Sequence, residues 1–264
     1  MNILLCNDDG FRARGLRRLA RALAAEHHLT VSAPQAECSA TGHGLTLRQP
    51  LRVVVDEEEG LSFHGVGGLP ADAAKYGLSH LCAGDPPDLV LSGINHGANT
   101  GQNLFYSGTV AAAAEGTFAG IPALAVSLAA HPGENLEEGL ETAVAAVRRV
   151  LALLEDHPLP PDVLLNMNVP NRPAAQVKGL RVSRMGHARF HEVFHERRDP
   201  AGRPYYWMDG AKNGDDREPD HDDHQVHADW VSLTPLRLDL THPAWASLLD
   251  PWDLEAHTLS REDA

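Results

Sequence analysis

Short apolar runs alternate with amphipathic stretches over the first 170 residues of the chain. The apolar runs predict buried strands at 2–6, 29–33, 88–92, 123–128 and 163–169. Apolar residues that recur at helical spacing predict helices at 16–23, 110–119 and 134–155. Strands that alternate with helices indicate an α/β fold, in which a mainly parallel sheet carries helices on both faces.

The pattern changes after about residue 171, where the chain becomes polar and rich in histidine. Strand-like pieces at 180–183 and 205–208 predict hairpins in an arm that projects from the core. We expect this arm to serve as an oligomer contact. A return strand is predicted at 231–240 and a terminal helix at 243–257.

These patterns divide the chain into a core, 1–170, which we expect to carry the functional site, and a C-terminal region, 171–264. Among the 264 residues, 36 acidic side chains outnumber 22 basic ones, which gives a net charge of −14. Long nucleic acids and anionic membranes bind basic surfaces, so we expect neither as a partner. Most of the excess acid lies beyond residue 130, away from the candidate site.

The cysteines and the apolar segments bear on where the protein works. Three cysteines without a C-x-x-C spacing indicate reduced thiols, and the short apolar run at the N-terminus does not predict an export signal. The segment 109–130 carries a single charge, Glu115, but Gly116, Gly120 and Pro122 interrupt it. A helix followed by a buried strand explains this segment better than a membrane span, so we expect a cytoplasmic protein.

The first candidate site is Asn7-Asp8-Asp9-Gly10, which directly follows the first predicted strand. Ligands of open α/β sheets bind beyond the carboxyl ends of the strands, where this motif lies. Two adjacent carboxylates repel each other unless a cation neutralises them, and Mg²⁺ and Mn²⁺ prefer oxygen ligands. A turn whose aspartate caps the next helix is the alternative interpretation.

The second candidate site is the glycine- and asparagine-rich stretch 92–101, followed by a Tyr-Ser-Gly-Thr sequence at the start of a predicted helix. Glycine lets the backbone approach an anion, and a helix N-terminus offers N–H groups and a favourable dipole to phosphate. Ser107 and Thr109 add hydroxyl groups. Asn95 and Asn99 add amides that suit a metal ion or phosphate. A plain helix cap at Ser107 is the alternative interpretation.

These motifs, in this order, resemble those of the SurE family. The resemblance rests on ILLCNDDG at 3–10, on Ser39 after Ala-Pro, and on LSGINHGANTGQNLFYSGTVAAAAEG at 91–116. The C-terminal half agrees through NMNVP at 166–170 and VSLTPL at 231–236. The family consists of metal-dependent 5'/3'-nucleotidases linked to stationary-phase survival, and the likeness covers nearly the whole chain.

The resemblance implies a set of site residues and an assembly. One divalent ion per subunit, Mg²⁺ or Mn²⁺, would be held by Asp8, Asp9, Ser39 and Asn95. The implied phosphate contacts are Asn99, Ser107, Gly108 and Thr109. The resemblance also implies a Rossmann-like core and a C-terminal arm exchanged between protomers of a homodimer or homotetramer.

The chain departs from the family pattern at two places. Cys38 and Ala40 flank Ser39 where the family carries arginine and glycine. Leu69 and Ala71 replace the two threonines of the family's Gly-Thr-Pro-Thr-Asp sequence. These departures leave the implied metal ligands in place and bear on substrate preference.

The expected function is that of a 5'-nucleotidase, a metal-dependent phosphomonoesterase acting on nucleoside 5'-monophosphates and, as in the family, 3'-monophosphates. The metal is expected to polarise the phosphoryl oxygens and activate water for in-line attack, with Asp8, Asp9 and Asn95 as the catalytic group. Either aspartate can serve as general base or nucleophile. A nucleoside N-ribohydrolase and a non-catalytic sensor of phosphometabolites or metal are the alternatives.

Two groups of histidines raise the question of a second metal site. They are His187, His191 and His195, and His221, His224 and His227. A helix would place the first group on one face, but the resemblance predicts a non-helical arm there. The second group adjoins an acidic stretch that favours a solvated loop, so we assign neither group as a metal site.

Overall fold

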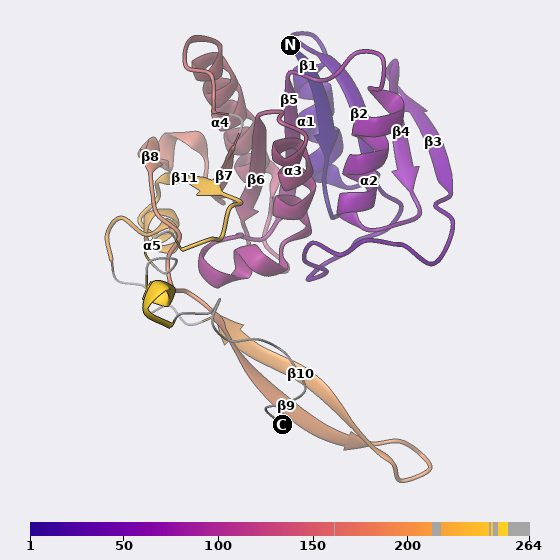
Figure 1. The fold of residues 1–264 in the computed structure, drawn as a ribbon, viewed down its shortest axis with the longest axis vertical. Coiled ribbons are helices and arrows are strands. Elements are labelled where there is room, and N and C mark those ends of the chain that lie inside the picture. Colours follow the sequence, from indigo (N-terminus) through magenta and orange to yellow (C-terminus); the bar gives the residue numbers. More distant parts are fainter. Residues whose placement is uncertain (161, 213–217, 243, 245–247, 253–264) are drawn as a thin grey trace.

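A computed structural model describes residues 1–264 except 161, 213–217, 243, 245–247 and 253–264 (Figure 1). Its main sheet contains β1 (Asn2–Cys6), β2 (His28–Pro34), β3 (Val53–Glu58), β4 (Leu61–Val66), β5 (Leu89–His96), β6 (Ala123–Ala129), β7 (Val163–Pro170), β8 (Leu180–Val182) and β11 (Val231–Arg237). The strand order is β3-β4-β2-β1-β5-β6-β7-β11-β8. Neighbouring strands are parallel except for β3 with β4 and β11 with β7, which confirms the predicted mainly parallel sheet.

Helices cover both faces of the sheet. Two of them, α1 (Arg14–Leu23) and α4 (Glu137–Asp156), pack on one face and share a hydrophobic core with it. The other face is covered by α2 (Pro70–Tyr76) and α3 (Gly108–Phe118), which lie side by side in Figure 1. The remaining helical segments are α5 (Asp222–His227), the π-helix η1 (Gly77–Leu81), and the 3-10 segments η2 (Gly101–Tyr106), η3 (Ala174–Gln176) and η4 (Asp250–Trp252).

The strongest sequence patterns match the structure, because continuous apolar runs form the buried central strands. The pattern does not predict β3, β4 or α2. The edge strand β3 is largely exposed, and only its first three residues, Val53 to Val55, are apolar before three acids follow, a run too short to mark a buried strand. The structure also extends β5 to His96, past a shift in its pairing with β6 between Ser92 and Asn95. Such an irregularity turns the following side chains to new directions, and here it precedes Asn95.

The order of the strands fixes where a ligand can bind. From β1 the chain passes to β2 on one side, whereas β5 lies on the other side of β1. The carboxyl ends of β1 and β5 therefore meet at a topological switch point, where ligands of open α/β sheets bind. The two candidate sites follow these two strands and thus meet at one edge of the sheet.

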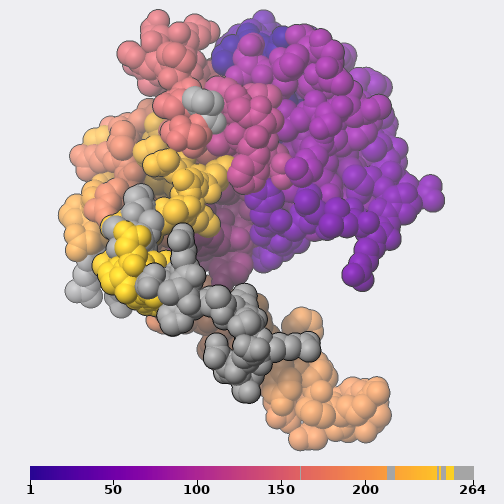
Figure 2. Space-filling model, viewed as in Figure 1, coloured from indigo at the N-terminus to yellow at the C-terminus, as the bar shows by residue number. Residues whose placement is uncertain are grey.

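The C-terminal region contributes to the sheet and to a separate arm. The arm is an antiparallel hairpin of β9 (Phe190–Arg198) and β10 (Pro204–Lys212), and it extends away from the core (Figures 1 and 2). In contrast, β8 and β11 belong to the main sheet. The division at residue 170 stays a prediction. The predicted helix at 243–257 falls mostly outside the described residues, and within the described ones no helix is long and apolar enough to cross a membrane.

Gly15 lets α1 approach β5 directly beneath the candidate site. A Cβ atom at Gly15 would lie 2.0 Å from the carbonyl oxygen of Ile94, the residue before Asn95. Contacts this short do not occur, so any larger residue must push the helix away from the strand. The Gly15-Leu16 sequence is therefore a packing requirement of the switch point.

We predict that Gly15→Ala lowers the free energy of unfolding by about 1–3 kcal/mol through overpacking. Alanine has the higher helix propensity, so a loss reports the clash with Ile94 and not the helix itself. Urea unfolding of the metal-free protein measures the change. Gly84→Ala, where a Cβ meets open space, is the matched control and should leave stability nearly unchanged. Equal stabilities of the two variants would contradict the packing argument.

Candidate functional site

The first candidate site is a tight turn after β1. Asn7 closes it, because its side-chain Nδ2 donates to the carbonyl oxygen of Gly10 at 3.0 Å. Gly10 has a φ of +102°, which suits glycine. The next helix begins after Ala13, whose position carries no side-chain capping bond. Neither aspartate caps this helix, so the alternative interpretation of the motif does not apply.

Asp8 is a buried carboxylate held by the start of α3. Its side chain is 7% exposed, and the Thr109 hydroxyl donates to its Oδ1 at 2.5 Å. A Cβ atom at Gly108 would lie 2.7 Å from the Cβ of Asp8, so the helix start presses directly on this residue. Burial raises the pKa of Asp8, while bonds from the Thr109 hydroxyl and from backbone N–H groups oppose the rise.

Asp9, the next carboxylate, is only partly buried. Its Oδ2 accepts a hydrogen bond from the backbone N–H of His96 at 3.1 Å, which connects the end of β1 to the end of β5. Burial, together with the charges of Asp8 and Glu37, raises the pKa of Asp9 to about 7. Within the described part of the chain, no lysine, arginine or histidine forms an ion pair with either aspartate. A buried and a partly buried acidic group are thus adjacent, and no basic side chain of the described residues pairs with either.

Ser39 lies on the loop that follows β2, and its side chain is exposed. The loop reaches the first site through the backbone N–H of Cys38, which donates to the carbonyl oxygen of Asp8 at 2.8 Å. The Ser39 hydroxyl donates to Glu37 Oε1 at 2.6 Å. Ala40 has a φ of +56°, a left-handed conformation that costs roughly 1–2 kcal/mol for a residue with a Cβ. The departure from glycine at this position therefore strains the loop.

Asn95 projects from the end of β5 after the pairing shift. Its Nδ2 donates to the carbonyl oxygen of Gly97 at 2.7 Å, which turns the amide oxygen the other way. Asn95, Asp9, Glu37 and His96 line a cavity of about 240 Å³ between the ends of the strands and the helices α1 and α4. The structure thus brings Asn95 and Asp9 to the same cavity.

The residues at this edge fit a divalent metal ion. Two carboxylates without a basic partner among the described residues, an amide oxygen and the hydroxyl of Ser39 form the all-oxygen donor set that Mg²⁺ and Mn²⁺ prefer. A bound cation would neutralise the charge repulsion that raises the pKa of Asp9. Glu37 was not among the predicted site residues. The only feature of the sequence that could have indicated it is its position as an acid two residues before Ser39.

The predicted phosphate residues at the start of α3 have structural bonds of their own. Ser107 is the N-cap, and its hydroxyl oxygen accepts from the backbone N–H of Val110 at 3.1 Å. The capping interpretation is therefore correct, although the hydroxyl proton stays available to a ligand. The Thr109 hydroxyl donates a hydrogen bond to Asp8, so the Thr109 side chain orients this carboxylate.

Asn99 lies in a buried network away from Asp8 and Asp9. Its Nδ2 donates to Ser127 Oγ at 2.8 Å, and its backbone N–H donates to Asn168 Oδ1 at 2.8 Å. Asn166 Nδ2 donates to the Asn99 carbonyl oxygen at 2.8 Å. The two asparagines of the NMNVP motif thus fix the path of the glycine-rich loop across the sheet edge.

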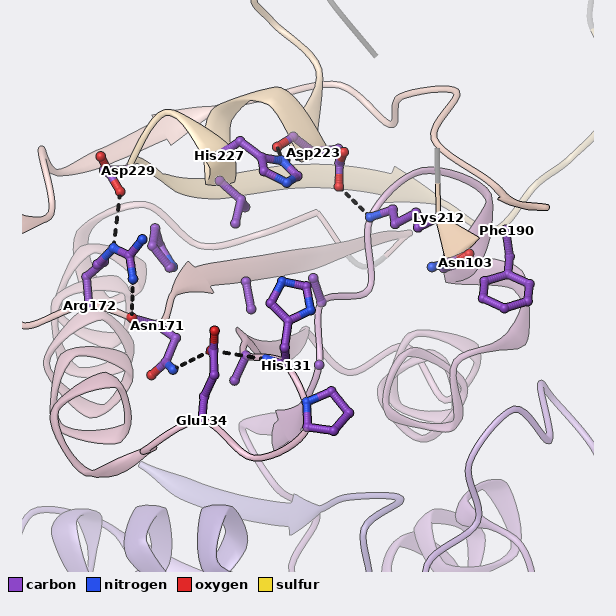
Figure 3. A pocket seen from close by; sticks show the side chains of 17 residues that line it. Asn103, His131, Glu134, Asn171, Arg172, Phe190, Lys212, Asp223, His227 and Asp229 are labelled. Atoms are coloured by element: carbon purple, nitrogen blue, oxygen red, sulfur yellow. Dashed lines mark hydrogen bonds and ion pairs between the residues drawn. The ribbon is translucent and has the colours of Figure 1, made fainter. Parts of the chain in front are cut away.

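A larger cavity, of about 660 Å³, lies where the arm meets the core (Figure 3). Lys212, the last residue of β10, forms an ion pair with Asp223 of α5 on its wall. Arg172, which follows β7, pairs with Asp229 at 3.8 Å. These ion pairs connect the arm to α5 and the core to the turn after α5. The cavity wall is therefore a contact between these parts of the chain.

The structure divides each histidine group between different elements, and His187 and His221 make an edge-to-face ring contact with centroids 5.3 Å apart. His191 and His195 lie on strand β9 and not on a helix, while His224 and His227 belong to α5. His227 Nδ1 lies 2.8 Å from the carbonyl oxygen of Asp223, a contact within its own helix. In the described part of the chain, no three histidine, cysteine or acidic side chains gather as a metal site.

The chain is similar in sequence and fold to known proteins. The family model described as "Survival protein SurE" matches residues 3–192. The chain belongs to the SurE family. In Syntrophobacter fumaroxidans, a protein named 5'-nucleotidase SurE is 42% identical over 96% of this chain and 100% of its own length. The protein of that name from Gloeobacter violaceus is 44% identical, with 94% of both chains covered.

Membership in the SurE family extends to the fold. The crystal structure of the SurE protein from Aquifex aeolicus superposes with a TM-score of 0.81 at 36% identity. The match covers 96% of this chain and 99% of that one. At this identity and coverage, the C-terminal region and the core both share the fold of that relative.

We predict that Asp9→Asn stabilises the metal-free protein by about 1–3 kcal/mol at about pH 8, because it removes a partly buried charge next to the like charge of Asp8. The folded-state pKa of Asp9 lies above its ordinary value, so its ionisation destabilises the fold as the pH rises toward 7. The gain should shrink toward about pH 5, where the folded protein holds the proton. Urea unfolding in EDTA measures it, with the exposed Asp209→Asn as control. An Asp9→Asn variant less stable than wild type at both pH values would refute the charge argument.

Proposed function

We propose that this chain is a metal-dependent 5'-nucleotidase, which hydrolyses nucleoside 5'-monophosphates to nucleoside and phosphate. The observation that carries the proposal is a pair of adjacent carboxylates at the switch point: Asp8 is buried against the start of α3, and Asp9 lines the neighbouring cavity. The names of the SurE relatives support the same activity. Hydrolysis of 3'-monophosphates is a finer part of the proposal that rests on the family resemblance.

In this proposal the metal ligands are Asp8, Asp9, Ser39 and Asn95. When bound, a single Mg²⁺ or Mn²⁺ ion supplies positive charge that polarises the phosphoryl oxygens and acidifies water. Asp8 is oriented by Thr109, and Asp9 by the backbone N–H of His96. For Ser39 to become a ligand, its hydroxyl must turn from Glu37, which a rotation about one bond allows.

The phosphate contacts come from the start of α3 in this proposal. The proton of the Ser107 hydroxyl and the N-terminal dipole of an 11-residue helix favour the charge of the phosphoryl group. Gly108 brings the backbone within reach, because it has no side chain between the helix and Asp8. Asn99 contributes through the loop that it anchors, and its remaining amide proton is directed by the bond to Ser127.

A proton acceptor for the attacking water is needed in any such reaction. Asp9 is the better candidate, since its cavity side is open and its carboxylate accepts only one backbone bond among the contacts described here. Asp8 is held by Thr109 and by the helix start, which favours a role as a fixed ligand. Asn95 completes the catalytic group as a neutral ligand.

The proposal predicts that the protein with 5'-AMP and Mn²⁺ releases phosphate and no free adenine, and that EDTA stops the reaction. Asp8→Asn and Asp9→Asn should each lower kcat/KM by at least about 100-fold, a loss typical of groups that act on the transition state. Separate assays for phosphate and free base measure the outcome. Asp209→Asn, on the exposed arm, is the control and should keep wild-type activity.

Other products would identify other functions. Free adenine without phosphate would mean glycosidic cleavage, as in a nucleoside N-ribohydrolase. Tight nucleotide or Mn²⁺ binding without either product would mean a sensor. Full activity in both aspartate variants would exclude the proposed metal ligands.

We further propose that the arm binds a second copy of the chain, in a homodimer or a homotetramer. Phe194 and Met208 are paired across the hairpin and share one face, whereas Trp207 lies on the other face opposite His195. All three apolar side chains are more than half exposed. An isolated two-stranded hairpin is marginally stable in water, so one with apolar residues on both faces needs a covering surface.

The arm proposal predicts that Trp207→Asp shifts the assembly toward monomers, because burying a charge at a self-contact is unfavourable. Size-exclusion chromatography with light scattering measures the mass. Trp252→Asp, an equally exposed tryptophan outside the arm, is the matched control. An unchanged mass for Trp207→Asp would show that the arm does not hold the oligomer.

A further inference from the structure

The segment 35–52 connects β2 to β3 without forming a helix or a strand, and we call it the Ser39 loop. It carries the proposed metal ligand Ser39 next to Ala40, whose left-handed conformation is unfavourable for alanine. A strained loop keeps one conformation only where contacts from outside hold it. Contacts with the rest of the chain must therefore hold this loop over the site.

Three backbone N–H groups attach the loop to the rest of the chain. The N–H of Cys38 donates to Asp8, as described above. The N–H of Gly42 donates to the carbonyl oxygen of Tyr106 at 3.0 Å, and the N–H of Thr46 donates to the Asp72 carboxylate at 3.1 Å. Asp72 belongs to α2 and also accepts from the backbone N–H of Leu69.

A side chain in the middle of the loop makes a further contact. His43 Nε2 lies 2.8 Å from Oε1 of Glu115, a residue of α3. The imidazole also stacks on Phe118 one turn further along α3, with ring centroids 5.6 Å apart. His43 thus connects the Ser39 loop to the side of the same helix whose first turn holds Asp8.

Glu115 is the lone charge in the apolar segment 109–130, and its side chain is 4% exposed. Its second oxygen, Oε2, accepts from Lys75 Nζ of α2 at 2.7 Å. Burial raises the pKa of Glu115, but the bonds to His43 and Lys75 outweigh burial and leave the pKa below its ordinary value. A buried carboxylate with two donors is a fixed anchor, because an unpaired one is costly.

We propose that His43 is a positioning residue, which through Glu115 holds the Ser39 loop in register with the metal site. Helix α3 then sets both parts of the ligand group: its first turn orients Asp8 through Thr109, and its middle orients Ser39 through His43. This inference rests on the proposed role of Ser39 as a metal ligand.

Two substitutions at the same carboxylate test the proposal. His43→Ala and Lys75→Ala each remove one donor from Glu115, and both side chains are partly exposed, at 36% and 49%. Only His43 lies on the Ser39 loop. Lys75→Ala is therefore the matched control for the loss of one bond to Glu115.

The first measurement is amide hydrogen exchange in the metal-free protein. His43→Ala should speed the exchange of the Gly42 and Thr46 amides, which report the attachment of the loop. The second is Mn²⁺ binding without substrate, followed by electron paramagnetic resonance. The dissociation constant should rise about tenfold in His43→Ala and stay near wild type in Lys75→Ala, as for other residues that orient a ligand.

A conservative variant separates positioning from folding. His43→Gln keeps a side-chain N–H donor for Glu115 and should recover part of the lost Mn²⁺ affinity. If His43→Ala fails to fold, Phe118→Ala removes the ring beneath His43 and should weaken Mn²⁺ binding in the same direction.

Equal effects of His43→Ala and Lys75→Ala on Mn²⁺ affinity, or an unchanged loop exchange in His43→Ala, would overturn the proposal. Neither measurement uses phosphatase activity. A protein that binds Mn²⁺ with this pattern but does not hydrolyse 5'-AMP would refute the proposed function and leave the role of His43 standing.

Discussion

The first turn of α3 lies against the carboxylate of Asp8, with the Thr109 hydroxyl and backbone N–H groups as its donors. This contact needs glycine at position 108, because any side chain there would collide with Asp8. It also needs β1 and β5 to be neighbours, so that the helix following β5 begins beside the residue following β1. The turn at Asp8 and Asp9 and the Ser39 loop, through the bond from Cys38 to Asp8, both adjoin this contact.

The net negative charge of the protein does not conflict with an anionic substrate. The buried Asp8 and the partly buried Asp9 are adjacent and form no ion pair with a basic side chain of the described residues, so the site favours a cation. Once a cation is bound, the local charge changes sign before a phosphate group approaches. The net charge of −14 bears on large polyanions and says little about this single position.

Much of the fold was predictable, because the central strands are buried on both faces and their sequences are continuous apolar runs. The edge strand β3 was not, since three valines followed by three acids do not distinguish an exposed edge strand from a loop. Helix α2 also went unpredicted. Among the site residues, the motifs predicted Asp8, Asp9 and Asn95 from their place after strands. The family resemblance, and not the residue spacing, suggested Ser39. The sequence showed Glu115 only as a lone charge in an apolar segment.

The sequence by itself determined the α/β class, the alternation of the central strands with α1, α3 and α4, and the oxygen-rich chemistry at two strand ends. These are local properties, because burial pattern and residue type are written along the chain. Only the tertiary structure decided that the Thr109 hydroxyl serves Asp8, that Asn99 is held between β6 and β7, and that His43 reaches Glu115 across 72 positions. Such partners depend on which elements become neighbours in the sheet and on its faces, and no local pattern encodes that choice.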